Sequence, residues 1–189
     1  MRQASPARRD GHDIEWDAHS AFRHMSLAAW FGIFADQYDD LDLIAQEACK
    51  VIAVGVREQF AAVLRFRADQ QTLVLQAGTG RHGADASGVR QAADPVATAG
   101  LAWHTSQLVH FRSLGPCGRV CAIGSMRAQD VQSLLSVAMR EEVDESFGVL
   151  EVGSAAAQKF TGHDTPFQRA LSYDLAAAME RRAATFTPG

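Results

Sequence analysis

Two cysteines four residues apart carry the most reactive chemistry in this sequence. Cys117 and Cys121 lie in the run Cys-Gly-Arg-Val-Cys, and a helical conformation would place both thiols on one face. Such a pair can attach a tetrapyrrole covalently, form a redox couple in which Arg119 lowers the pKa of a thiolate, or supply half of a metal site. Two ordinary reduced thiols beside a pocket wall are the simplest interpretation of the same spacing.

Two histidines and an arginine flank a short strand expected at residues 108–111. His104 and His110 can each reach a pocket ligand or a haem iron, although a lone histidine more often ends a helix or hydrogen-bonds within a wall. Arg112 is the natural partner for a carboxylate or phosphate of a ligand, and otherwise a surface cation. These residues indicate a binding site more than a catalytic one.

Several catalytic signatures are missing from the sequence. The glycine-rich stretch over residues 78–88 lacks the Lys and Ser/Thr of a phosphate-binding P-loop. No Ser-His-acid order, paired-carboxylate motif or phosphotransfer motif stands out. Catalysis is therefore the minority interpretation, and no metal site is expected.

Helical periodicity marks two N-terminal segments. Apolar residues, many of them aromatic, recur at helical spacing over residues 14–34, and one apolar stripe recurs over residues 41–56. The first helix must bury its stripe against its own domain or against a second copy of the chain. Cys49 falls on the stripe of the second helix, which predicts a small buried side chain.

Two later helices are expected from their capping residues. Asp94 is a suitable N-cap for a short helix that begins at Pro95 and reaches residue 103. Thr161 and Asp164 form an acidic variant of the capping box, which opens a terminal helix that runs to about residue 183. Between the helices, alternating apolar residues predict two antiparallel hairpins, at residues 60–67 with 73–77 and at residues 132–141 with 147–152.

Three local motifs, in this order, resemble the GAF family of sensory domains, and most closely the GAF modules of bacterial sensor kinases. Residues 100–109 match the family's short helix that passes through a polar turn into a strand. Residues 146–152, Ser-Phe-Gly-Val-Leu-Glu-Val, match its glycine-valine-leucine strand, and residues 160–164 match its entry to the last helix. The resemblance spans roughly residues 41–182.

The resemblance implies an α+β fold, with an antiparallel sheet, helices packed mainly on one face and a ligand pocket on the other. The irregular segment at residues 112–130 would close that pocket. The expected organisation is a disordered tail (1–13), an extra N-terminal helix that can serve dimerisation (14–40), a sensory domain (41–183) and a C-terminal tail (184–189). The candidate ligand-binding residues are Trp103, His104, His110, Phe111, Arg112, Cys117, Cys121, Ser133 and Met139.

The family resemblance leaves the ligand open, because its members bind cyclic nucleotides, haem, linear tetrapyrroles, small metabolites or nothing detectable. It implies a regulatory domain in bacterial signal transduction that binds a small molecule or a signalling protein in trans and forms a homodimer through its terminal helices. One alternative is a pure dimerisation module without a ligand. The other is a thiol enzyme like the GAF-type methionine sulfoxide reductases, although the cysteine that those enzymes place in the short helix is absent.

Composition sets the remaining limits. The chain has 189 residues, 47% of them hydrophobic, which is typical of a globular protein. Its 18 Lys and Arg against 22 Asp and Glu give a net charge of −4, so a nucleic-acid partner is not expected. No apolar run is long enough to cross a membrane, and three cysteines, an odd number, indicate reduced thiols. We therefore expect a cytoplasmic protein.

Overall fold

A six-stranded antiparallel sheet forms the centre of the molecule. The computed structural model describes residues 11–80, 88–114, 131–140, 147–157 and 159–185. The strands lie in the order β3-β2-β1-β6-β5-β4, so that β1 and β6 are central. Their bounds are β1 Phe60–Arg67, β2 Thr72–Gly78, β3 Arg90–Ala92, β4 Val109–Phe111, β5 Ser133–Met139 and β6 Gly148–Ser154.

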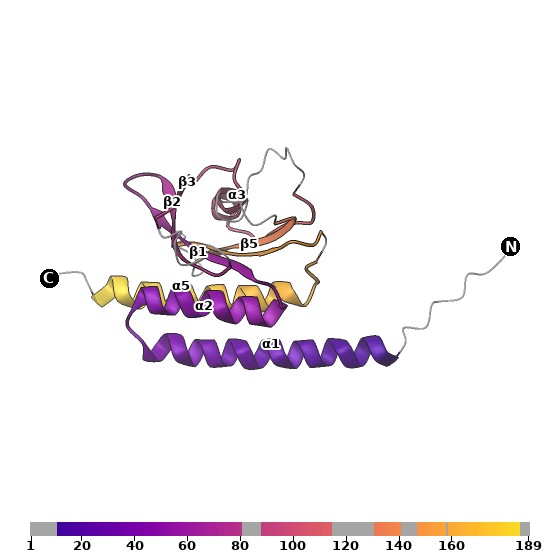
Figure 1. Cartoon of the computed structure of the whole chain (residues 1–189). Helices are drawn as coiled ribbons and strands as arrows, with labels where there is room; N and C mark the ends of the chain where they lie inside the picture. Colours follow the sequence, from indigo (N-terminus) through magenta and orange to yellow (C-terminus); the bar gives the residue numbers. More distant parts are fainter. Residues whose placement is uncertain (1–10, 81–87, 115–130, 141–146, 158, 186–189) are drawn as a thin grey trace.

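The described helices cover the two faces of this sheet unequally (Figure 1). Helices α2 (Leu41–Val56) and α5 (Asp164–Thr185) lie side by side against one face, and α1 (Gly11–Gln37) lies outside them as a further layer. Of the helices that the structure describes, only α3 (Thr98–Thr105) packs on the opposite face, over β5 and β6. The predicted α+β architecture, with helices mainly on one face and an extra N-terminal helix, is confirmed.

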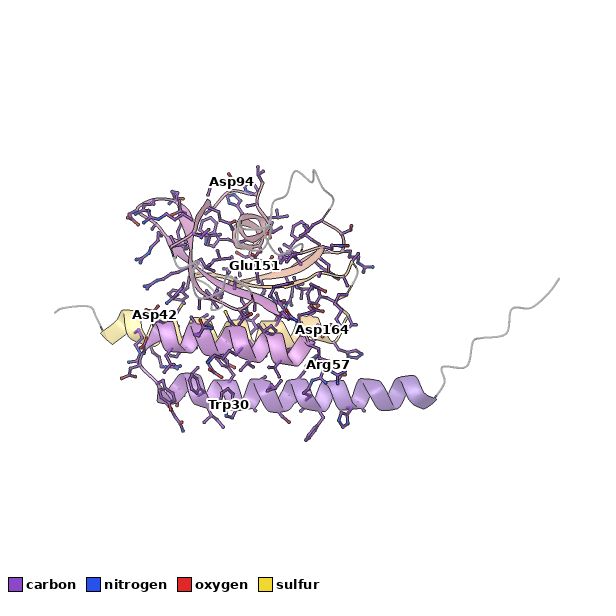
Figure 2. The ribbon with its side chains drawn as sticks, in the orientation of Figure 1. Trp30, Asp42, Arg57, Asp94, Glu151 and Asp164 are labelled. Carbon is purple, nitrogen blue, oxygen red and sulfur yellow. The ribbon has the colours of Figure 1, made fainter. Side chains whose placement is uncertain are left out.

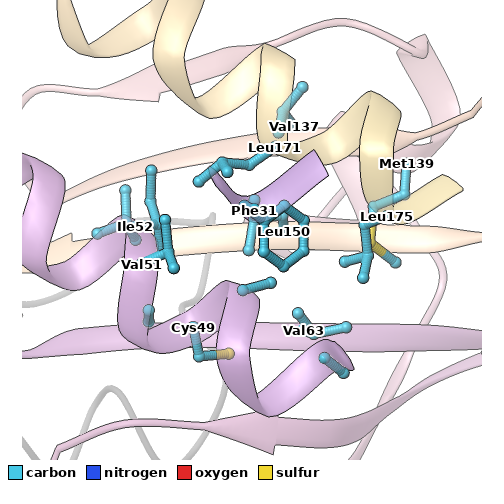
Figure 3. Packing of buried hydrophobic residues seen from close by; sticks show 14 of the residues in the cluster. Phe31, Cys49, Val51, Ile52, Val63, Val137, Met139, Leu150, Leu171 and Leu175 are labelled. Atoms are coloured by element: carbon cyan, nitrogen blue, oxygen red, sulfur yellow. The ribbon is translucent and has the colours of Figure 1, made fainter. Parts of the chain in front are cut away.

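The larger hydrophobic core lies between the sheet and these helix layers (Figure 3). Ile52 from α2, Leu150 from β6 and Leu171 from α5 are fully buried in it, and Phe31 of α1 reaches the same cluster. Cys49 is fully buried there as well, as its place on the apolar stripe predicts. Burying each of these large side chains contributes about 2 kcal/mol to folding.

Helix α1 is apolar on two sides. Its inner side buries Phe31 and Ala35 against the domain. Its outer side leaves Phe22, Met25 and Ile33 exposed by 70%, 72% and 61%. The aromatic stripe predicted from the sequence therefore divides: the domain covers one part, and another part faces outward.

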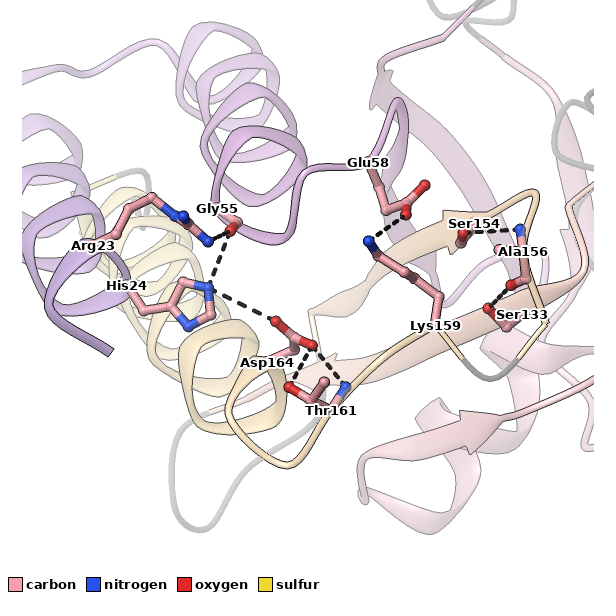
Figure 4. A network of polar contacts seen from close by, with 10 residues as sticks. All are labelled: Arg23, His24, Gly55, Glu58, Ser133, Ser154, Ala156, Lys159, Thr161 and Asp164. Atoms are coloured by element: carbon pink, nitrogen blue, oxygen red, sulfur yellow. Dashed lines mark hydrogen bonds and ion pairs between the residues drawn. The ribbon is translucent and has the colours of Figure 1, made fainter. Parts of the chain in front are cut away.

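A polar and aromatic contact fixes α1 to the start of α5 (Figure 4). His24 stacks on the Phe167 ring with centroids 4.4 Å apart, while its Nε2 lies 3.1 Å from the Gly55 carbonyl oxygen and 3.7 Å from Asp164 Oδ1. A Cβ on Gly55 would lie 2.1 Å from the Phe167 ring, so only glycine lets α2 approach α5 this closely. Asp164 also accepts hydrogen bonds from the Thr161 amide and hydroxyl at 2.7 and 2.9 Å, close to the predicted capping box.

The structure differs from the sequence-based expectation in two places. The prediction that a helix begins at Pro95 with Asp94 as its N-cap is wrong: α3 begins at Thr98, and its N-cap Ala97 makes no side-chain hydrogen bond. Asp94 instead accepts a bond from the Val96 amide at 3.0 Å within the preceding turn. Strand β3 was not expected, because three residues at a sheet edge are too few to show a pattern.

Within the described ranges, no helix combines the length and the apolar character needed to cross a membrane.

Candidate functional site

A single buried carboxyl lies on the central strand β6, on the face that α3 covers (Figure 2). Glu151 has no exposed surface. In the register of the sheet it is opposite Ala62 on β1 and Ser136 on β5. A carboxyl in the middle of a sheet is costly to bury unless its oxygens are hydrogen-bonded, so its surroundings decide what it can do.

Two hydroxyls hold one oxygen of this carboxyl and leave the other without a partner. Ser136 Oγ and Thr98 Oγ1 donate to Glu151 Oε1 at 2.6 and 2.9 Å. Oε2 is buried and has no hydrogen-bond partner among the described residues. Because both donors converge on one oxygen, Oε2 is free to accept a proton or a hydrogen bond from another group.

The protonation of Glu151 follows from this environment. Burial raises the pKa of its carboxyl to about 7, and the hydrogen bonds from Ser136 and Thr98 oppose that rise. Near neutral pH the group is therefore divided between a neutral acid and a carboxylate. An incoming hydrogen-bond donor would favour the carboxylate, because it would supply the partner that Oε2 lacks.

Small residues bring α3 close enough to the sheet for Thr98 to reach Glu151. Ala99 and Ala102 belong to α3 and are fully buried. A Cβ on Gly100 would lie 1.8 Å from the Asp94 carbonyl oxygen, so this position tolerates only glycine while the turn before α3 keeps its place. Because these residues are small, α3 lies close to the sheet, and the Thr98 hydroxyl reaches Glu151 on the central strand β6.

Apolar and aromatic side chains share the α3-covered face of the sheet with the buried carboxyl. We call them the α3-side cluster; its buried members include Leu64, Leu134 and Val149, and Trp103 and Phe111 pack against it. Trp103 stacks on Phe66 with ring centroids 4.3 Å apart. The site combines one polar group with an apolar wall, as small-molecule sites usually do.

The structure brings some of the sequence-predicted site residues to this face and leaves others away from it. Trp103 and Phe111 belong to the α3 side, and His104 is exposed beside Trp103. Ser133 is buried and donates to the Ala156 carbonyl oxygen at 2.7 Å (Figure 4). Arg112 is exposed.

His110 and Met139 lie toward the opposite face. Met139 is fully buried in the core between the sheet and the helices. His110 packs edge-on against Phe160, with centroids 6.0 Å apart, and its Nε2 is buried without a hydrogen-bond partner in the described part of the chain. Desolvation and, to a lesser extent, nearby Arg112 lower the pKa of His110, against an opposing effect of Asp164.

None of the three cysteines of the sequence belongs to the site around Glu151 as the structure describes it. Cys117 and Cys121 are outside the described residues. Burial raises the pKa of the Cys49 thiol to about 12, so this third cysteine is not a nucleophile. Among the residues that the structure describes, no three His, Cys, Asp or Glu side chains gather where they could hold a metal ion.

Sequence reasoning did not single out Glu151, Ser136 or Thr98. The available signal was a charged residue inside an otherwise apolar strand, Gly-Val-Leu-Glu-Val. An acid at such a position must either face solvent or find buried partners. The sequence alone does not say which, because the two hydroxyls lie 15 and 53 residues away.

Comparison with known proteins decides the fold. No protein-family model matches this sequence, and no curated protein matches it. Among solved structures, the GAF domain of a phosphoenolpyruvate-protein phosphotransferase from Coxiella burnetii superposes with a TM-score of 0.78 at 14% identity, over 87% of this chain and 97% of that one. The chain has a GAF fold. The resemblance drawn from three short sequence motifs is thereby confirmed at the level of fold.

Two other structures with this GAF fold show how different its members can be. Residues 122 to 287 of a methyl-accepting chemotaxis protein superpose with a TM-score of 0.69 at 12% identity, over 84% of this chain and 99% of that one. Free methionine-R-sulfoxide reductase from Neisseria meningitidis, solved with its substrate, gives 0.74 at 14% identity over 98% of this chain and 99% of that one. The last match is long enough to include α1.

Proposed function

We propose that this chain is a cytoplasmic regulatory domain that binds a small molecule against the α3 face of its sheet. The observation that carries the proposal is Glu151, a fully buried carboxyl. One of its oxygens accepts two hydrogen bonds, and the other has no partner among the residues that the structure describes. Leaving a buried acceptor without a bond costs about 1–3 kcal/mol, which a ligand donor would recover. The structural neighbours include a GAF domain of a phosphotransferase and part of a methyl-accepting chemotaxis protein, which supports a sensory role.

The chemistry of the site favours a ligand with an N–H donor on an otherwise apolar body. An amine or amidine would donate to Oε2 and hold Glu151 as a carboxylate, while the rings of Trp103 and Phe66 would contact the apolar part. A ligand that offers only hydrogen-bond acceptors cannot donate to Oε2. It would bind the neutral acid form of Glu151, with a smaller gain in binding free energy.

Binding would change the position of α3. Oε2 has no access to solvent, so a ligand reaches it only when α3 or its neighbours move. Thr98 joins α3 to Glu151 through a single hydroxyl, so the movement exchanges this contact for one to the ligand. Occupancy then shifts the population toward a conformation with α3 displaced.

The proposal is tested by thermal unfolding with a panel of primary amines and amidines, after native mass spectrometry of the purified protein has reported any mass retained from the host. A binding amine raises the melting temperature of the wild type and leaves Glu151→Gln unchanged. Asp69→Asn, which removes an exposed carboxylate, should respond as the wild type does. A ligand that stabilises wild type and Glu151→Gln equally excludes Glu151 as the recognition group.

The outer side of α1 provides the surface through which the domain would dimerise. Phe22, Met25 and Ile33 form an exposed apolar stripe on the layer farthest from the sheet. A second copy of α1 would bury both stripes, and α5, which packs on the inner side, would carry a change at the ligand site to this interface. Such a homodimer would pass the signal to a protein partner in trans.

Analytical ultracentrifugation tests the dimer. Met25→Glu combined with Ile33→Glu places charges on the stripe and should give a monomer with unchanged helical content. Val54→Glu is the matched control, since Val54 of α2 is 62% exposed and lies off this stripe. A wild-type monomer excludes the dimer, and a dimer without any amine response favours a dimerisation module whose site is filled by its own side chains.

The alternative enzymatic function rests on the near full-length superposition with the Neisseria reductase. In that reaction two thiols lose two protons and two electrons to form a disulfide, and the sulfoxide oxygen leaves as water. Here only Cys117 and Cys121 can supply the thiols, because Cys49 is buried. Incubation with free methionine-R-sulfoxide should consume two thiols per chain if the chain is a reductase and none if it is a sensor.

A further inference from the structure

A cavity lies at the β4 edge of the sheet, where β4 and β5 stop pairing. The register of these strands ends at Val109 and Ser136, while β5 continues to Met139. The chain before β4 diverges at Ser106, which ends α3 in a left-handed conformation with φ 56°. The opening has a volume of about 290 Å³, and the first half of α5 forms its other wall.

The lining of this cavity is polar and positively charged. Arg140, at the end of β5, and Arg169, on α5, both line it, together with the side chains of Ser172 and Tyr173. Leu108 and Val137 supply its apolar part. The cavity contains no carboxylate among the described residues.

Both guanidinium groups lack partners in the described part of the chain: no hydrogen bond or ion pair joins either side chain to another group there. Other arginines near α1 and α5 are paired. Arg23 donates to the Gly55 carbonyl oxygen at 2.9 Å, and Arg181 donates to that of Ala35 at 3.0 Å. Two cations that share one cavity repel each other, and an anion between them removes that repulsion.

We infer that this cavity binds a small oxyanion, a phosphate monoester or a dicarboxylate, between Arg140 and Arg169. Guanidinium forks match the oxygens of phosphates and carboxylates in pairs, which gives shorter and stronger hydrogen bonds than neutral donors give. The volume suits a metabolite of a few atoms beyond the anionic group. The site is separate from Glu151, since Val137 belongs to the core on the helix-facing side of the sheet.

Occupancy of this site would link two elements of the proposed sensor. Ser106 ends α3, and Arg169 belongs to α5. An anion held in the cavity therefore contacts the C-terminal end of α3 and the side of α5. It would therefore hold the C-terminal end of α3 near α5 while the N-terminal end remains free to move at Thr98.

Isothermal titration with inorganic phosphate and with succinate, at constant ionic strength, tests the inference on the full chain. We expect saturable binding of at least one of the two anions, weakened about tenfold or more in Arg140→Gln and in Arg169→Gln. Arg169→Lys should retain part of the affinity, because a lysine keeps the charge and loses the fork.

Arg67→Gln is the matched control, because Arg67 is exposed and lines a different cavity beside Arg65. It should bind as the wild type does. The inference is overturned if neither anion binds saturably, if chloride competes equally, or if Arg67→Gln loses as much affinity as Arg169→Gln. This outcome is independent of any amine response at Glu151, so the two sites can fail separately.

Discussion

Thr98, the first residue of α3, donates its hydroxyl to Glu151 Oε1 across 2.9 Å, and thereby joins α3 to the central strand β6 of the sheet. Ser136 supports the same oxygen from the neighbouring strand at 2.6 Å. One oxygen of the buried carboxyl thus accepts two hydrogen bonds. Because the bond from Thr98 lowers the pKa of Glu151, the protonation of this carboxyl depends on the position of α3.

Thr98→Val should loosen α3 while preserving its shape. Loss of the hydroxyl removes one donor to Glu151, which costs about 1 kcal/mol of unfolding free energy and speeds amide hydrogen exchange in residues 98–105. Thr105→Val is the control, because the Thr105 hydroxyl donates only to the Leu101 carbonyl oxygen within α3. Equal exchange rates in the two variants would contradict a tie through Glu151.

Glu151→Gln should change how stability depends on pH. The pKa of Glu151 is about 7 in the folded state, above the ordinary value of 4.5, so the unfolded chain releases this proton first as pH rises. The wild type therefore loses unfolding free energy between about pH 4.5 and pH 7, by roughly 3 kcal/mol, and the loss is complete above that range.

Urea unfolding at about pH 5 and about pH 8 measures this difference. Glutamine does not titrate, so Glu151→Gln should become more stable relative to the wild type at the higher pH. Asp69→Asn should follow the wild type at both values. An unchanged gap between Glu151→Gln and the wild type at the two pH values would show that Glu151 is already ionised in the folded protein.

Gly55→Ala should destabilise the packing of α2 on α5. The new methyl group would lie 2.1 Å from the Phe167 ring, and the ring cannot move freely because His24 stacks on it. We expect a loss of about 2 kcal/mol of unfolding free energy. Gly162→Ala serves as the control, since its Cβ would meet no atom within 4 Å, and it should lose far less.

Cys49 should resist thiol reagents in the folded protein. Its side chain is fully buried and its thiol pKa is about 12, so almost no thiolate forms at neutral pH. Peptide mapping after iodoacetamide treatment should find Cys49 unmodified under native conditions and fully modified in concentrated guanidinium chloride. Rapid native labelling would mean that α2 opens on the timescale of the reaction.

Periodicity and capping in the sequence predicted most of the elements, including two antiparallel hairpins, and the resemblance to the GAF family implied the α+β fold. The apolar stripe of residues 41–56 required one core-facing side, and Thr161 with Asp164 marked the start of α5. These features depend on residues within a few positions of one another, so one sequence contains the information. The start of α3 was missed because Asp94 hydrogen-bonds equally well in a turn.

The tertiary structure alone decided what the site contains. Glu151, Ser136 and Thr98 become neighbours only through strand register and the approach of α3, across separations of 15 and 53 residues. The same holds for Arg140 and Arg169, which line one cavity because α5 packs against β5. Which side of α1 faces the domain was likewise settled by packing, because its apolar residues occur on both sides.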